Sequence, residues 1–172
     1  MLHIQNMFVD NIRIFARAGK GGNGLVSFRR AKFVPKGGPD GGDGGDGGSV
    51  ILEVDPHTND LRSFFYDPKL IATDGVGGQS AKKHGKNGKS VIGKVPPGTI
   101  IYRSNASSMA EATWLEREGE GIELEKIADL TEIGTRFTLC QGGIGGKGNW
   151  HFRSATNQAP TEAEMGTEGE EG

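Results

Sequence analysis

The sequence predicts an all-β domain of about eight short strands, with a separate glycine-built element protruding from it. Short runs of Ile, Val, Leu and Phe are bounded by turn residues along most of the chain, without a regular alternation of strands and helices. Residues 37–48 read GGPDGGDGGDGG, in which aspartate recurs every third residue. That period matches a polyproline II helix, and glycine lets such helices approach each other closely. We therefore expect an ordered glycine scaffold rather than the flexible linker that glycine-rich chains often form.

The strands are expected at the apolar runs. The first lies within residues 8–18, where Ile12, Ile14 and Ala16 alternate with arginines. The others are expected at residues 49–54, 61–66, 90–95, 99–102 and 135–140. The runs SVILEV and LRSFFY are expected to pair as a hairpin within a mostly antiparallel arrangement. Residues 106–118 are the best helix candidate, because Ala, Met, Leu and Glu favour helix.

Glycine-rich segments occur three times, at about residues 19–48, 75–98 and 141–160, and we expect them to leave the sheets and meet as a bundle. Together with the strands they make one domain over residues 7–165, a size that suits a single core. Residues 1–6 are expected to be an N-terminal extension. Residues 166–172 are acidic and rich in glycine, which is typical of a linker that buries nothing.

The motifs that resemble a nucleotide-binding loop fail on their context. Gly88, Lys89 and Ser90 match the end of a P-loop, but the first glycine of that motif would fall at Lys83, and the residues that follow favour a strand. The segment GKGGNG at residues 19–24 lacks the helix that a dinucleotide fingerprint requires. We expect no catalytic residue and no nucleotide hydrolysis in this chain by itself.

Metal binding is also a weak interpretation. The aspartates of GGDGGDGG resemble fragments of a calcium-binding nonapeptide repeat, but the apolar residue of that repeat is missing. The aspartates are expected instead to be solvated or to cap neighbouring backbone N–H groups. The four histidines are scattered, and the one cysteine has no partner. No metal ligand is therefore assigned.

The single cysteine, Cys140, excludes an internal disulfide and lies in an apolar run, where a small buried residue is expected. Neither a signal-peptide pattern nor an apolar run of 18 residues occurs. A cytoplasmic protein without membrane insertion is expected, and we expect it to be monomeric.

The positive charges gather in the glycine-rich segments. Residues 19–39 and 75–98 each carry five basic residues and no acid, whereas residues 111–132 carry eight acids and the last eleven residues carry five. Three glycine-associated loops that are basic in this way favour contact with nucleic acid. Lysine and arginine would then neutralise backbone phosphates, independently of the base sequence.

Several motifs together resemble the N-terminal domain of the Obg GTPases over about residues 7–171. They are FVD at residues 8–10, the block from GKGGNG to GGDGGDGG, VPPGT, IADLT and GGIGGKGNWHF. The resemblance implies a glycine-rich bundle of polyproline-type helices on a small eight-stranded β-barrel or sandwich. It also implies a parent GTPase that binds GTP and magnesium in a further domain beyond the acidic linker. That family acts in late assembly of the large (50S) ribosomal subunit, and its loop tips contact ribosomal RNA near the peptidyl-transferase region.

The resemblance places RNA-binding side chains on all three loops, with no catalytic, cofactor or metal residue in this chain. The residues are Arg29, Arg30, Lys32, Lys36, Lys82, Lys83, Lys86, Lys89, Lys147 and Arg153. Two positions depart from the usual pattern, because Ala31 stands where an acid is common and Gln141 where a basic residue is common. Residues 103–126 look longer and more acidic than the usual connection. A protein interaction through the acidic segment 111–132, with the bundle as a spacer, is the alternative function.

Overall fold

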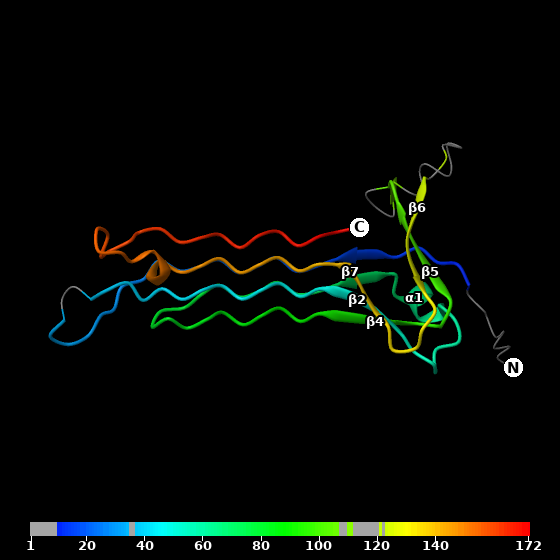
Figure 1. Cartoon of the computed structure of the whole chain (residues 1–172), viewed down its shortest axis with the longest axis horizontal. Helices are drawn as coiled ribbons and strands as arrows, with labels where there is room; N and C mark the ends of the chain where they lie inside the picture. The colour runs from blue at the N-terminus through cyan, green and yellow to red at the C-terminus, as the bar shows by residue number, and fades with distance from the viewer. Residues whose placement is uncertain (1–9, 35–36, 107–109, 112–120, 122) are drawn as a thin grey trace, which may run out of the picture.

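The computed structural model describes residues 10–34, 37–106, 110–111, 121 and 123–172 of the chain. The strands gather at one end, and a long bundle of extended segments protrudes from them (Figure 1). We call the strand-bearing part, residues 10–17, 50–72, 91–106 and 123–140, the β region. The predicted fold class, all-β with a protruding glycine-rich bundle, is confirmed.

Seven strands and two short helices lie wholly within the described part of the chain. In chain order they are β1 (Phe15–Arg17), β2 (Val50–Val54), α1 (Arg62–Tyr66), β3 (Lys69–Ile71), β4 (Val91–Val95), β5 (Thr99–Ser104), β6 (Leu124–Leu130), β7 (Arg136–Cys140) and the 3-10 helix η1 (Asn149–Phe152). Neither helix is long and apolar enough to cross a membrane, among the residues described. Of the helix candidate at 106–118, most residues lie outside the described part.

The strands form three sheets, β1–β3, β4–β2–β7 and β5–β6. The prediction of a mostly antiparallel arrangement is wrong for two of the pairs, because β1 runs parallel to β3 and β2 runs parallel to β4. The cause is the bundle: β1 and β3 both lead out into it, whereas β2 and β4 both return from it. β7 leads out again, and it is accordingly antiparallel to β2.

The predicted strand at residues 61–66 is wrong, since this segment forms helix α1. β2 already has β4 on one edge and β7 on the other, so no edge is left for a hairpin partner. Asp60 Oδ1 also accepts the N–H of Arg62 at 3.0 Å, a local bond that favours a turn over a strand. Phe64 faces the core, and its neighbours Phe65 and Tyr66 are exposed.

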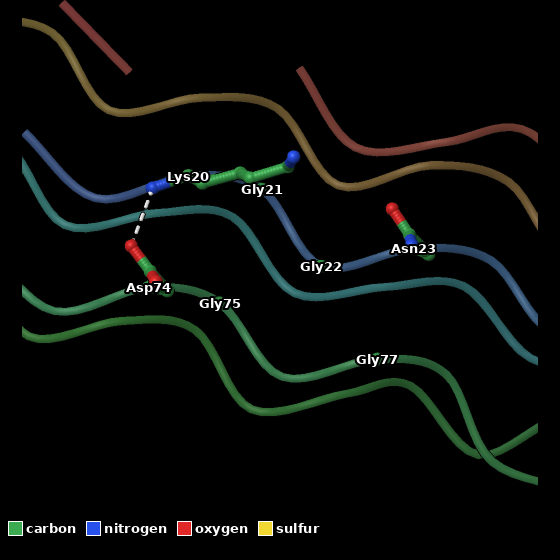
Figure 2. Close-up of a pocket in the computed structure, with 7 residues that line it drawn as sticks. All are labelled: Lys20, Gly21, Gly22, Asn23, Asp74, Gly75 and Gly77. Atoms are coloured by element: carbon green, nitrogen blue, oxygen red, sulfur yellow. Dashed lines mark hydrogen bonds between the residues drawn. The ribbon is translucent and has the colours of Figure 1, made fainter. Parts of the chain in front are cut away.

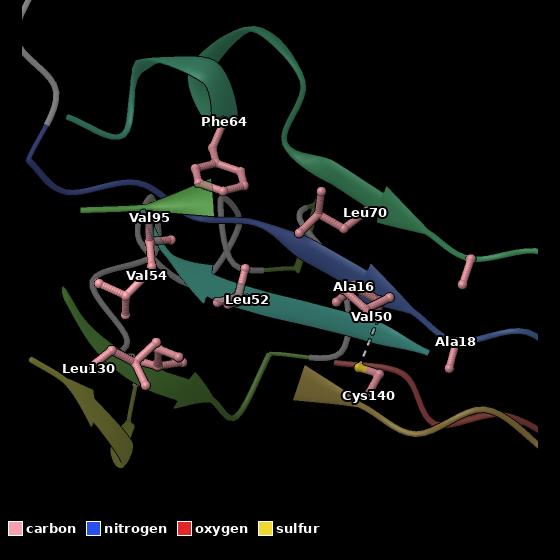
Figure 3. Packing of buried hydrophobic residues seen from close by; sticks show 12 residues of the cluster. Ala16, Ala18, Val50, Leu52, Val54, Phe64, Leu70, Val95, Leu130 and Cys140 are labelled. Carbon is pink, nitrogen blue, oxygen red and sulfur yellow. Dashed lines mark hydrogen bonds between the residues drawn. The ribbon is translucent and has the colours of Figure 1, made fainter. Parts of the chain in front are cut away.

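β2 supplies the centre of the hydrophobic core (Figure 3). Its alternate residues Val50, Leu52 and Val54 are fully buried, as a half-buried strand requires. Cys140 closes one side of this core, with its Sγ 3.7 Å from the carbonyl oxygen of Ala16. Burial raises the pKa of the Cys140 thiol. This confirms the expectation of a small buried residue.

The bundle consists of six extended segments of the described chain, at residues 18–25, 40–49, 73–79, 82–90, 141–149 and 160–172. Its hydrogen bonds repeat every third residue: the N–H groups of Gly19, Gly22 and Leu25 donate to Gly48, Gly45 and Gly42, respectively. The two described glycines with positive φ, Gly98 and Gly134, both lie in the β region. A three-residue repeat of bonds between segments, rather than within them, is the pattern of packed polyproline II helices.

The aspartates of the triplet repeat cap backbone N–H groups of neighbouring segments. Asp43 Oδ1 accepts the N–H of Gly148, and Asp46 Oδ1 accepts the N–H of Gly145, both at 2.8 Å. Asp40 Oδ2 accepts the N–H of Ala81 at 3.1 Å. Aspartate at every third position therefore places one acceptor on each turn of the helix, and the capping alternative is confirmed.

The acidic C-terminal residues 166–172 were expected to be a linker, but they are a hydrogen-bonded member of the bundle, although none of them is buried. Gly21 and Ala18 donate their N–H groups to the carbonyl oxygens of Thr167 and Glu170. Gly172 then exchanges two backbone bonds with Ala16 beside the core, at 2.8 and 2.9 Å. The segment adds no apolar side chain. It packs because Gly166 and Gly169, at a spacing of three, let its backbone approach the first segment.

Candidate nucleic-acid interface

The end of the bundle far from the β region is built from three chain reversals (Figure 1). They are a loop in residues 26–34 and 37–40, a turn at residues 79–84, and the stretch 149–160, which begins with η1. We call these residues the tip. The first loop starts as a narrow hairpin, because the N–H of Arg29 donates to Gly38 at 2.9 Å. The turn is joined to it through the N–H of Lys82, which donates to Asp40 at 2.7 Å.

Asn149 fastens the reversals together. Its side chain is fully buried, and Oδ1 accepts the N–H groups of Gly41 and Ser27 at 2.9 and 3.3 Å. Its Nδ2 donates to the carbonyl oxygens of Pro160 and Ser27 at 3.0 and 3.1 Å. One amide therefore satisfies four backbone groups, through two buried and two part-buried hydrogen bonds, which fixes where the first loop lies.

Replacing Asn149 with aspartate should cost about 3 kcal/mol of unfolding free energy. The variant keeps the shape and the acceptor, but a carboxylate oxygen then faces the carbonyl oxygens of Ser27 and Pro160. Urea unfolding would measure this loss. Asn157→Asp is the control, because Asn157 is exposed in the same stretch, and a change below about 0.5 kcal/mol is expected there. Equal effects of the two substitutions would contradict the assigned role of Asn149.

The structure places the predicted RNA-binding residues in two groups. Those that belong to the tip or lie directly beside it are Arg29, Arg30, Lys32, Lys82, Lys83, Arg153 and Lys147. Lys86 and Lys89 lie on the side of the bundle, and the carbonyl of Lys89 accepts the N–H of Thr73 close to the β region. At about 3.1 Å per residue, Lys89 is roughly 22 Å from Lys82 along the bundle. Lys36 lies outside the described residues.

All nine described candidates are exposed. The ion pairs of lysine and arginine within the described chain join Lys20 to Glu168, Arg62 to Asp60, Lys126 to Asp129 and Arg136 to Glu53. None of them involves a candidate residue. The positive charge of the tip is therefore available to a partner from outside.

Two aromatic side chains, Trp150 and His151, connect a lysine of the tip to the bundle. The Nζ of Lys82 lies 5.0 Å from the centre of the Trp150 ring, within the range of a cation–π contact. The Trp150 ring packs against the His151 ring at a tilt of 34°, with 3.8 Å between the ring centres. His151 Nε2 in turn lies 2.8 Å from Asp43 Oδ2. This chain of contacts joins the turn at 79–84 to η1, and sequence patterns gave no signal for it.

The pKa of Asp43 reflects the same contacts. Burial by itself raises the pKa of this carboxyl, but the hydrogen bonds from Gly148 and His151 outweigh burial and hold it below the usual 3.8. A carboxyl with a lowered folded-state pKa stabilises the fold fully above its unfolded value, and this contribution is lost as the pH falls through the folded-state pKa.

We therefore expect Asp43→Asn to be less stable than the wild type at neutral pH, because the amide oxygen can still accept from Gly148 but the charge beside His151 is lost. The difference in stability between the two proteins should shrink as the pH is lowered below 3.8. Melting temperatures of both proteins over an acid pH series would measure it. A gap that stays constant over that series would contradict this assignment.

A shallow groove on the side of the bundle is the other notable surface feature (Figure 2). It is lined by Lys20, Gly21, Gly22, Asn23, Asp74, Gly75 and Gly77. The backbone N–H of Lys20 donates to Asp74 Oδ1 at 2.9 Å. The side-chain Nζ of Lys20 forms an ion pair with Glu168 at 2.6 Å. The hydrogen bond and the charge of Glu168 raise the pKa of Lys20. The polar groups of this groove thus serve to join segments of the bundle.

No group of three His, Cys, Asp or Glu side chains is placed to hold a metal ion within the described residues. Among the buried side-chain oxygen and nitrogen atoms of the described residues, Asp40 Oδ1 has no hydrogen-bond partner. It lies beside the turn at 79–84. The site that the geometry supports is accordingly the cationic tip.

Comparison with known proteins identifies one family, that of the Obg GTPases, over nearly the whole chain. The GTP1/OBG family model matches residues 9–172. A protein named GTPase Obg from Akkermansia muciniphila is 99% identical over 96% of this chain, and those from Chlorobium chlorochromatii and Methylacidiphilum infernorum are 50% and 48% identical over 95% and 96% of it. The chain spans about half of each relative's length, 47%, 44% and 46% respectively. By its sequence, the chain belongs to the GTP1/OBG family.

Proposed function

We propose that this chain is the ribosome-binding domain of an Obg-type GTPase that acts in assembly of the large ribosomal subunit, and that its tip contacts ribosomal RNA near the peptidyl-transferase region. The observation that supports the proposal is the set of exposed cations at the tip, none of which is paired with a carboxylate in the described chain. Such cations bind phosphate by releasing counterions from the RNA backbone.

The shape of the molecule suits this role. The bundle is long and narrow, and its width is set by backbones that touch without intervening side chains. Because its segments are joined by hydrogen bonds every third residue, the tip is held at a fixed distance from the β region. A stiff, slender element of this kind can reach into a narrow RNA cleft, where a globular surface could not enter.

The parent protein is proposed to bind and hydrolyse GTP with magnesium through residues beyond this chain. This chain offers the RNA-contacting part, and its own residues take no step of that reaction. In the parent, the nucleotide state of the other half would change how the tip engages the subunit. The closeness of Gly172 to Ala16, beside the core of the β region, gives a physical route for such an effect.

Sedimentation of the chain with purified large ribosomal subunits over a salt series tests the proposal. With four to six phosphate contacts, the logarithm of the binding constant should fall with the logarithm of salt concentration with a slope of roughly −3 to −5. Binding that is absent at low salt, or that does not change with salt, would refute phosphate contact as the mode of binding.

The alternative is a protein interaction module that uses the acidic segment 111–132. Within the described part of that segment, Glu123 and Glu125 are exposed on or beside β6, at the opposite end of the molecule from the tip. Changing both to glutamine removes two of these charges and leaves the tip intact. If subunit binding falls with this pair and survives neutralisation of the tip lysines, the protein interaction is the correct function.

A further inference from the structure

The turns of the tip hold three residues in a backbone conformation that favours glycine. Phe33, Ala81 and Lys82 have φ values of 70°, 59° and 57°. In the described β region, by contrast, the positive-φ positions are occupied by Gly98 and Gly134. A side chain in the left-handed region strains the backbone, more so when it is bulky. The backbone of the tip is thus strained at three positions where glycine would relieve the strain, and each of these positions carries a side chain.

Phe33 is the clearest of these cases. The N–H of Val34 donates to Ala31 at 3.0 Å, which closes a four-residue turn with Phe33 at its third position. Glycine or asparagine is the usual residue there when φ is positive. The Phe33 side chain is 89% exposed, the highest value among the large hydrophobic residues described. The ring therefore gives the fold no core contact in return for the strained turn.

The surroundings of the Phe33 ring are cationic. The Nζ of Lys32 lies 5.3 Å from the ring centre, and Arg29 and Arg30 precede it on the same loop. An apolar protein surface would be a poor match for a single ring among unpaired cations. A nucleotide matches both features, because its base can stack on an aromatic face while its phosphate binds a neighbouring lysine or arginine.

We propose that the tip binds an unpaired RNA base by stacking it on the Phe33 ring, with the flanking phosphates held by Lys32, Arg29 and Arg30. The inference rests on the proposed RNA contact and narrows its target to RNA with a base free of pairing. A base inside a duplex is stacked between its neighbours and presents no free face, whereas loops and bulges present splayed-out bases.

A thermodynamic cycle between the protein and the RNA tests this contact. The probe is an RNA stem-loop, compared with the same stem-loop in which the loop nucleosides are abasic, so that the phosphates are unchanged. The protein variants are Phe33→Leu, which is apolar without an aromatic face, and Phe33→Tyr, which keeps one. Binding constants are measured with the full 172-residue chain at one fixed salt concentration.

The expected result is a loss of roughly 5- to 150-fold in affinity for the normal stem-loop with Phe33→Leu, the range measured for one stacked base. Phe33→Tyr should bind like the wild type. The abasic RNA should bind the wild type more weakly by a similar factor, and Phe33→Leu should then change its affinity by less than about twofold.

Phe33→Gly separates this role from a structural one. Because it removes the strained side chain, the variant should melt at the same temperature as the wild type or higher, while it loses the affinity for the normal stem-loop.

Two other outcomes would overturn the inference. If Phe33→Leu leaves the affinity for both RNAs unchanged, base stacking is wrong and phosphate contact alone remains. If it leaves RNA binding unchanged but weakens binding to large ribosomal subunits, the ring contacts a protein instead. A wild type that binds neither RNA, nor the large subunit, would refute the proposed function itself.

Discussion

Replacing Gly44 with alanine is expected to destabilise the bundle by more than about 3 kcal/mol. A Cβ atom at this position would lie 1.8 Å from the carbonyl oxygen of Gly22 and 2.2 Å from its carbonyl carbon, both of which are backbone atoms that no rotamer change can move away. The two segments would have to separate, which would break the repeated bonds between them, such as the one from Gly22 to Gly45. Urea unfolding and amide hydrogen exchange of the bundle would measure the loss.

Gly77→Ala is the matched control on a neighbouring segment. The nearest atom to its added Cβ is the carbonyl oxygen of Asn23 at 3.5 Å, an ordinary contact distance. The φ of Gly77 does not lie in the left-handed region. This substitution should therefore be neutral or stabilise the protein by about 0.4–1 kcal/mol, because alanine restricts the unfolded chain. A similar loss at both positions would contradict the view that backbone contact sets the packing of the bundle.

These two glycines illustrate what keeps the bundle together. The buried hydrophobic residues of the described core lie in the β region, apart from Ala18, which lies immediately beside it. Beyond these, the segments are joined by backbone hydrogen bonds and by short capping side chains such as Asp43 and Asp46. The stability of the bundle therefore depends on how closely the backbones approach. One added methyl group between two segments can destabilise it as much as a large cavity destabilises an ordinary hydrophobic core.

The sequence predicts the bundle because the signal is periodic. Aspartate at every third residue between glycine pairs favours a three-residue helix over a flexible linker, and the apolar run of Val50, Ile51, Leu52 and Val54 favours a strand. The same period was present at the end of the chain, where Gly166, Gly169 and Gly172 are spaced by three. The acidic residues between them are typical of disordered segments, and this compositional signal obscured the period.

Other features depend on tertiary context that no local pattern carries. Helix α1 forms where aromatic residues favour a strand, since both edges of β2 are taken. The four bonds of Asn149 join residues far apart in the chain, so the residue looks like any other polar residue after a glycine run. The distance of Lys89 from the tip follows from the rise per residue of a polyproline II helix. It can be calculated only when the turn at 79–84 is known to form part of the tip.

Removing the two tip lysines by Lys82→Gln and Lys83→Gln is expected to weaken RNA binding by on the order of tenfold to a hundredfold, and to reduce the salt slope by about 1.5. Lys86→Gln with Lys89→Gln removes the same net charge from the same loop, so the overall field of the protein changes equally. Along the bundle, Lys86 and Lys89 lie roughly 12 Å and 22 Å from Lys82, and both distances exceed the screening length of about 8 Å at physiological salt. The pair on the side of the bundle should therefore change affinity by less than about threefold.

Binding constants for both double variants, measured over the same salt series, distinguish position from charge. If the tip makes the contact, the two variants differ in slope as well as in affinity at every salt concentration. Equal losses would mean that RNA lies along the bundle or responds to net charge alone. Because Lys82 also lies over Trp150, its variant needs a melting curve, and Lys83→Gln alone should still lower the slope by about 0.7–0.9 without touching that ring.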